Sequence, residues 1–159
     1  LLDSKTSNVK PAGLGARDSL RLEAGLCLYG SDIDTSTTPV EAALAWLVAK
    51  RRRAERNFPG AEIIMKQLES GVTRRRVGIR MEKGPPARHG VKIFSNGNEI
   101  GEITSGSPSP SLGGNVGMGY VKEEFKKAGT KVELKIREKF YEAEVAKMPF
   151  TKPGYYHKP

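Results

Sequence analysis

VKIFSNGNEIGEITS, residues 91–105, carries the strongest local structural signal in the chain. Two short runs rich in β-branched and aromatic residues flank the dipeptide Asn96-Gly97. This dipeptide favours the two-residue turn of a β-hairpin, because both positions of the turn need a positive φ. The stretch therefore predicts two antiparallel strands, over 91–95 and 98–105.

Around this hairpin, hydrophobic and polar residues continue to alternate, which is the period of a strand with one buried face. Five or six short antiparallel strands, separated by turns, indicate a small barrel or a sandwich. We expect an irregular loop at 105–117, because Pro108 and Pro110 cannot donate hydrogen bonds to a central ladder. An extended tail is expected to follow after about residue 147. The further strands are expected at 73–82, 118–121, 130–138 and 140–147.

Before about residue 70 the hydrophobic spacing is that of helices. The segment TTPVEAALAWLVAKRRR (37–53) contains a capping box, with Thr38 as N-cap and Glu41 three residues later. Its apolar residues recur at helical spacing, so it predicts a helix over 38–50. Trp46 falls in the middle of this helix, where we expect its ring to pack.

Two shorter helices are also predicted. One covers 60–70 and ends at Gly71. The other begins after Asp18, whose carboxylate can cap it, and ends at Gly25. Together with the strands, these helices indicate a protein of mixed α and β structure.

Composition excludes several classes of protein. The single cysteine, Cys27, cannot form an internal disulfide. Since His89 and His157 are the only histidines, the sequence has too few Cys and His ligands for a zinc site. We therefore expect no metal. The uncharged stretch 103–121 is interrupted by Gly and Pro, so no membrane span is expected.

The chain is basic, with 27 Lys and Arg against 18 Asp and Glu and a formal charge of +9. Its basic runs, 50–53 and 74–76, could contact phosphates of a nucleic acid. No helix-turn-helix, paired aromatic RNA motif or GXXG loop accompanies them. We therefore interpret the first run as a helix end and the second as the solvated face of a strand, and we do not expect nucleic-acid binding.

Acidic residues give a weaker signal. Glu23, Asp32 and Asp34 are candidate polar site residues. Their spacing alone does not choose between a functional and a structural role.

Longer motifs carry a family resemblance. The string GARDSLRLEAGLCLYGSDIDTSTTPVEAALAW (15–46) is followed in order by FPGAE (58–62), IGEITSGSPSPSL (100–112) and KMPF (147–150). These motifs resemble the T-proteins of the glycine cleavage system, a family of aminomethyltransferases, in their eukaryotic mitochondrial form. A related iron–sulfur assembly branch carries a string like KGCYxGQE, which AGLCLYGSDI does not match.

The resemblance implies an α+β fold: the end of a helical and sheet-bearing folate-binding body, followed by a C-terminal antiparallel β-barrel. It implies a division into part of the folate-binding domain at 1–58, a linker with a helix at 59–72, and the barrel with its extended tail at 73–159. The family transfers a one-carbon unit from the aminomethyl-lipoyl arm of H-protein to tetrahydrofolate and releases ammonia. The implied partners are H-protein and folate, and the implied location is the mitochondrial matrix.

The resemblance also implies site residues. Arg17 matches the family's substrate-binding arginine, Tyr155 matches a C-terminal tyrosine that closes over folate, and Arg76 matches an arginine whose role is either binding or structural. The family's catalytic aspartate lies upstream of Leu1, so we expect a fragment that holds no catalytic residue and is inactive alone. The alternative is a stand-alone basic β-barrel module that binds RNA or an acidic protein.

Overall fold

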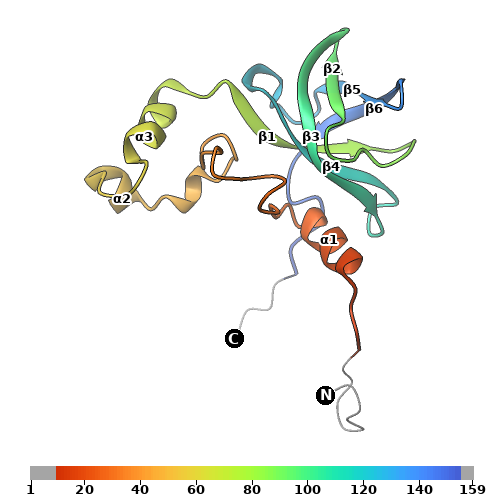
Figure 1. Cartoon of the computed structure of the whole chain (residues 1–159), viewed down its shortest axis with the longest axis horizontal. Helices are drawn as coiled ribbons and strands as arrows, with labels where there is room; N and C mark the ends of the chain where they lie inside the picture. The colour runs from red at the N-terminus through yellow and green to blue at the C-terminus, as the bar shows by residue number, and fades with distance from the viewer. Residues whose placement is uncertain (1–9, 155–159) are drawn as a thin grey trace.

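The structure, a computed structural model, describes residues 10–154, which form a helical part followed by a closed β-barrel (Figure 1). The helices are α1 (Leu14–Glu23), α2 (Lys50–Glu55) and α3 (Ala61–Ser70), with short 3₁₀ turns η1 (Ala45–Leu47) and η2 (Glu123–Phe125). The strands are β1 (Arg74–Met81), β2 (Lys92–Ser95), β3 (Asn98–Ser109), β4 (Gly114–Lys122), β5 (Lys131–Ile136) and β6 (Lys139–Ala146).

The barrel confirms the prediction of an antiparallel β domain. Its strands pair in the order β1-β4-β3-β2-β5-β6, and β6 pairs with β1 to close it. The hairpin between β2 and β3 turns where expected, with φ values of 50° at Asn96 and 77° at Gly97. Both values are positive, as the tight turn of a two-residue hairpin requires.

The barrel core is formed by the inward-facing residue of each alternating pair. Ile93, Ile103 and Leu134 are completely or almost completely buried. Val132, Leu134 and Ile136 all point inward from β5, as their alternation predicts. Period-2 patterning therefore identifies the core residues of β5.

One prediction about the strands is wrong. The stretch 105–117 is not an irregular loop, because β3 continues to Ser109 and pairs with β4, with Pro108 opposite Asn115. Proline is tolerated there because β3 pairs with β2 only as far as Glu102. On that side of β3 the backbone hydrogen bonds end at Ile103, which bonds to Gly90 and Val91. The missing N–H of Pro108 therefore interrupts no second ladder.

The predicted helix over 38–50 is also wrong. Its capping box does form: the N–H of Glu41 donates to Thr38 Oγ1 (3.2 Å), and the N–H of Thr38 donates to Glu41 Oε2 (3.1 Å). The chain then leaves the helical path at Ala43, whose φ is 57°. A single turn, the 3₁₀ segment η1 and the short helix α2 replace the predicted helix.

Tertiary hydrogen bonds explain this break. The N–H of Arg76 donates to the carbonyl of Glu41 (2.8 Å), and its Nε donates to the carbonyl of Ala42 (2.8 Å). Arg75 Nη1 donates to the carbonyl of Val40 (3.1 Å). A continuing helix would need these carbonyls for its own N–H groups four residues later. The arginines of β1 take them instead.

The remaining helices fit the sequence better. The prediction at 60–70 is confirmed by α3, and Gly25 ends α1 with a φ of 70°. The first helix begins earlier than predicted, at Leu14, and Asp18 does not cap it. Trp46 does not pack: 73% of its surface is exposed.

Helix α1 packs against β3 and β4 of the barrel, whereas α2 and α3 project away from the barrel (Figure 1). Leu22 turns its side chain from α1 toward the barrel, where it packs with Val116 and Met118. In the part of the chain that the structure describes, no helix is long and apolar enough to cross a membrane.

Close packing of the barrel strands leads to a first prediction, for Gly106→Ala. A Cβ at this position would lie 1.8 Å from the carbonyl oxygen of Ala87, so backbone must move. We expect the free energy of unfolding, measured by urea denaturation, to fall by about 2–3 kcal/mol. Gly15→Ala is the control, because nothing lies within 4 Å of a Cβ there and helical Ala is preferred over Gly by about 0.5–1 kcal/mol. Equal effects of the two changes would contradict the assignment of Gly106 to a close backbone contact.

Candidate functional site

The outer face of α1 is the first element of the candidate site. Arg17 is exposed there, one turn from both Leu14 and Leu20, whose side chains are 84% and 66% exposed. Positions three residues apart share a helix face, so Arg17 lies between the two leucines on one exposed stripe of α1. This face is turned away from the barrel, because Leu22, on another face of α1, packs against the barrel. The stripe can offer fixed hydrogen-bond donors and apolar contact to the same ligand.

Arg21 fixes this helix on the barrel. Its Nη1 pairs with Asp32 Oδ2 at 2.6 Å, and its Nη2 donates to Ser105 Oγ of β3 at 3.0 Å. Asp32 is only 1% exposed and also accepts from the N–H of Leu28 (2.9 Å) and from Thr104 Oγ1 (2.5 Å). This network sets the orientation of α1, and therefore of Arg17.

The C-terminal segment returns to the end of the same helix. The N–H groups of Phe150 and Thr151 donate to the carbonyl of Glu23, at 2.9 and 3.3 Å. The chain before Tyr155 is thus held beside α1. Tyr155 and His157 themselves lie outside the described residues, so the expectation that Tyr155 and Arg17 face one cleft stays a prediction.

Arg76 is placed differently from the sequence interpretation. Its side chain is not on a solvated face: the residue is 5% exposed, with Nη1 donating to the carbonyl of Gly25 (3.4 Å) and to Met118 Sδ (2.9 Å). Four consecutive residues of β1, from 76 to 79, are buried, so strict alternation fails at this position. The turn at 41–42 covers what would otherwise be the outer face of the strand.

Neither Tyr120 nor Cys27 is suited to proton transfer near neutral pH. Burial raises the pKa of Tyr120 to about 12, and its hydroxyl donates to the carbonyl of Asp32 at 2.8 Å. Burial also raises the pKa of the partly buried Cys27 thiol. Both groups therefore stay protonated near neutral pH. Among residues 10–154, no cluster of three His, Cys, Asp or Glu side chains is placed to hold a metal ion.

A hollow of about 830 Å³ lies elsewhere, on the face formed by β5 and β6. It is lined by Phe140 and Tyr141 among others, and neither Arg17 nor Arg76 lines it. The candidate site is therefore the exposed face of α1 with Leu14, Arg17 and Leu20, which we call the wall. Glu23 and Asp32, whose roles the sequence left open, support that wall from inside.

The described residues thus form a closed antiparallel barrel that carries a helix with an exposed, well-supported arginine, an arrangement that could bind a ligand. Comparison with known proteins agrees. The family described as "Glycine cleavage T-protein C-terminal barrel domain" matches residues 74–152, and the one described as "GCVT N-terminal domain" matches residues 1–52.

Individual relatives are similar over nearly the whole chain. Aminomethyltransferase, mitochondrial, from Solanum tuberosum is 55% identical over 100% of this chain and 39% of that protein. The Homo sapiens protein of the same description is 54% identical over 96% of this chain and 38% of that protein. The crystal structure of glycine cleavage system aminomethyltransferase T from Bartonella henselae superposes with a TM-score of 0.91 and 45% identity, over 96% of this chain and 43% of that one.

The chain belongs to the glycine cleavage T-protein family and corresponds to the C-terminal region of a T-protein. It spans about 39% of the length of the curated relatives it matches. The alternative of a stand-alone barrel module does not account for residues 1–52, which match the N-terminal domain of the same family.

Proposed function

We propose that this chain supplies one wall of the folate site in a tetrahydrofolate-dependent aminomethyltransferase of the glycine cleavage system. The observation that carries the proposal is the position of Arg17: exposed, flanked by leucines, and held by the Arg21–Asp32 network. The aminomethyltransferase names of relatives more than 50% identical support it.

In this reaction the aminomethyl group on the lipoyl arm of H-protein gives up its one-carbon unit to tetrahydrofolate, and the nitrogen leaves as ammonia. Arg17 binds the folate through its guanidinium, which donates several hydrogen bonds in a fixed fork to anionic or polar groups. The neighbouring leucines cover the apolar part of the ligand and exclude water. The charge of +9 favours encounter with anionic partners, folate polyglutamate and H-protein among them.

Tyr155 closes the site from the C-terminal tail. Chain length permits this: four residues beyond Thr151 span at most about 14 Å. Arg17 lies six residues before Glu23, about 9 Å along the helix axis. Because the carbonyl of Glu23 accepts the N–H of Thr151, both distances are counted from Glu23.

Arg76 acts through other residues. Its described contacts are main-chain carbonyls and methionine sulfurs. It joins the turn at 41–42 and the end of α1 to the barrel. We assign it a positioning role in the enzyme.

The division at 1–58, 59–72 and 73–159 is part of the proposal, and the family matches at 1–52 and 74–152 support it. The mitochondrial matrix is proposed as the location, since the relatives are described as mitochondrial.

A complete T-protein that carries these residues as its C-terminal part tests the function. Given tetrahydrofolate and aminomethyl-loaded H-protein, it should release ammonia, and Arg17→Ala should raise KM for folate by about ten- to a hundredfold through loss of a charge-assisted contact. Arg51→Ala is the control, because Arg51 is exposed on α2 and pairs only with Glu55 there. An unaltered KM in Arg17→Ala would remove the assignment of Arg17, and absence of ammonia release by the unmodified enzyme would overturn the function.

A further inference from the structure

Glu23, the last residue of α1, joins this helix to a second segment through its side chain. The residue is 4% exposed, and its carboxylate accepts hydrogen bonds from Ser109 Oγ (2.5 Å), Ser111 N (3.0 Å) and Ser111 Oγ (2.7 Å). These donors lie where the chain turns from β3 into β4. The carboxylate therefore fixes the C-terminal end of α1 to that turn.

Hydrogen bonds hold this charge without a cation. Among the described residues Glu23 forms no salt bridge. Burial alone would raise the pKa of Glu23, but the hydrogen bonds from Ser109 and Ser111 outweigh it and hold the pKa below its ordinary value. The carboxylate is thus an acceptor matched to three particular donors.

The main chain of Glu23 holds a third segment. Its carbonyl accepts the N–H groups of Phe150 and Thr151, at 2.9 and 3.3 Å. Phe150 and Met148 pack on the small cluster around Leu22, and a Cβ at Gly25 would lie 2.9 Å from Met148 Cβ. The C-terminal segment fits closely against the end of α1.

We infer that Glu23 is a positioning residue of the folate site: its side chain fixes the end of α1, the helix that carries Arg17, and its carbonyl holds the C-terminal segment at Phe150 and Thr151 against that end. This rests on the proposed function. Removing the carboxylate frees the end of α1 from the turn that contains Ser109 and Ser111. The carbonyl of Glu23, which holds the C-terminal segment, then moves with the helix end.

This role differs from general support of the barrel. The cluster around Leu22 is separate from the main barrel core that contains Ile93, Ile103 and Leu134. Loss of the Glu23 contacts therefore acts on the tail and on the helix end, and leaves the barrel core packed.

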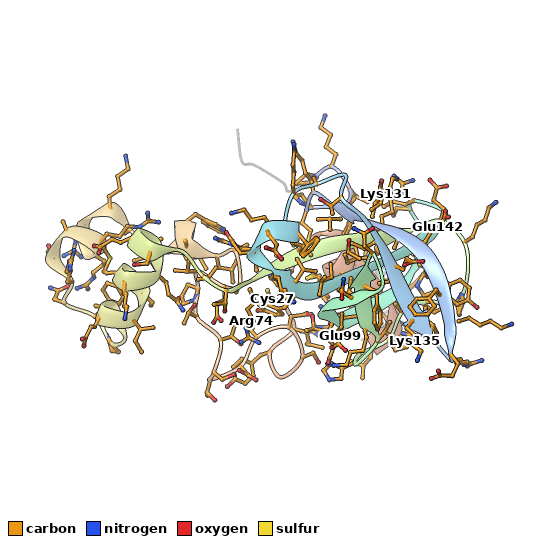
Figure 2. All side chains as sticks on the ribbon, turned by 90° about the horizontal axis from the view of Figure 1, so that it is seen from above. Cys27, Arg74, Glu99, Lys131, Lys135 and Glu142 are labelled. Atoms are coloured by element: carbon orange, nitrogen blue, oxygen red, sulfur yellow. The ribbon has the colours of Figure 1, made fainter. Side chains whose placement is uncertain are left out.

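Glu23→Gln in the complete enzyme is the test. Gln keeps the shape but replaces one acceptor oxygen by an NH₂ donor, which meets Ser111 N–H or the serine hydroxyls. We expect KM for tetrahydrofolate to rise about tenfold while kcat stays within about twofold of the unmodified enzyme, because ground-state and transition-state binding are lost together. Glu99→Gln is the matched control, an exposed carboxylate on β3 (Figure 2).

Ser111→Ala is a milder second variant, which removes one hydrogen bond from the same carboxylate. Its effect on KM should not add to that of Glu23→Gln, because both act on one contact. Additive effects, or an unchanged KM in both variants, would overturn the inference.

Hydrogen exchange on the 159-residue chain separates this inference from the proposed function. In Glu23→Gln the amides of Phe150 and Thr151 should exchange at least about tenfold faster, while those of Ile103 and Val145, in or beside the barrel ladder, keep their protection. Uniform loss of protection would show a merely structural role and overturn the inference. If the unmodified complete enzyme is inactive, the proposed function fails, and the exchange rates still decide whether Glu23 anchors the tail.

Discussion

Supplied alone with tetrahydrofolate and aminomethyl-loaded H-protein, the 159-residue chain should release no more ammonia than a blank without protein. Proton transfer at the reacting amine needs a positioned acid or base, a contribution of about a hundred- to ten-thousandfold in rate. Tyr120 and Cys27 do not supply one near neutral pH, because burial raises the pKa values of both. The open face around Arg17 would also leave bound folate in contact with water.

The measurement is ammonia release over time, with a complete T-protein as the positive control under the same conditions. Folate binding by the chain, followed by fluorescence or calorimetry, shows whether the wall is intact. Turnover close to that of the complete enzyme would contradict the assignment of the chemistry to residues outside this chain.

The second large effect is expected for Asp32→Asn. This carboxylate is almost fully buried, pairs with Arg21 at 2.6 Å and accepts hydrogen bonds from Leu28 N and Thr104 Oγ1. Removing one partner of a buried ion pair costs about 3–5 kcal/mol. Because the partly exposed Asp18 still pairs with Arg21, we expect a loss at the lower end of this range, about 3 kcal/mol. We expect the midpoint of urea denaturation to fall accordingly.

Asp18→Asn is the matched control, because Asp18 pairs with the same Arg21 but its side chain is 41% exposed. An exposed pair of this kind contributes about 1 kcal/mol or less. Equal losses in the two variants would contradict the view that burial of Asp32, and not its pairing with Arg21 alone, makes the network essential.

The barrel could be predicted from local pattern because its strands bury one face and turn at residues with suitable φ preferences. Alternation in β5 and the Asn96-Gly97 turn are both local signals, and both are confirmed. The sheet beyond Ser105 was missed because tolerance of Pro108 depends on where the neighbouring strand β2 stops pairing, which is not a local property.

The supports of the candidate site were harder to predict for the same reason. Thr38 and Glu41 form the predicted capping box, but arginines some 35 residues later capture the carbonyls that the helix needs. Glu23 and Asp32 are polar residues whose burial depends on partners on β3 and in the turn after it. Only the family resemblance pointed to Arg17, and no pattern in the residues distinguished it from other surface arginines.

The hydrogen bonds from Arg75 and Arg76 to the carbonyls of residues 40–42 also bear on how this region can change in length. The chain leaves that turn, runs out through α2 and α3, and returns to the same turn as β1 (Figure 1). Residues 44–73 thus form a loop whose two ends are fastened together, outside the barrel. Doubling a flexible loop costs only about 0.6 kcal/mol in closure entropy. Insertions and deletions between α2 and α3 should therefore leave the docking of α1 on the barrel unchanged, because the arginines of β1 hold the ends of the loop independently of its length.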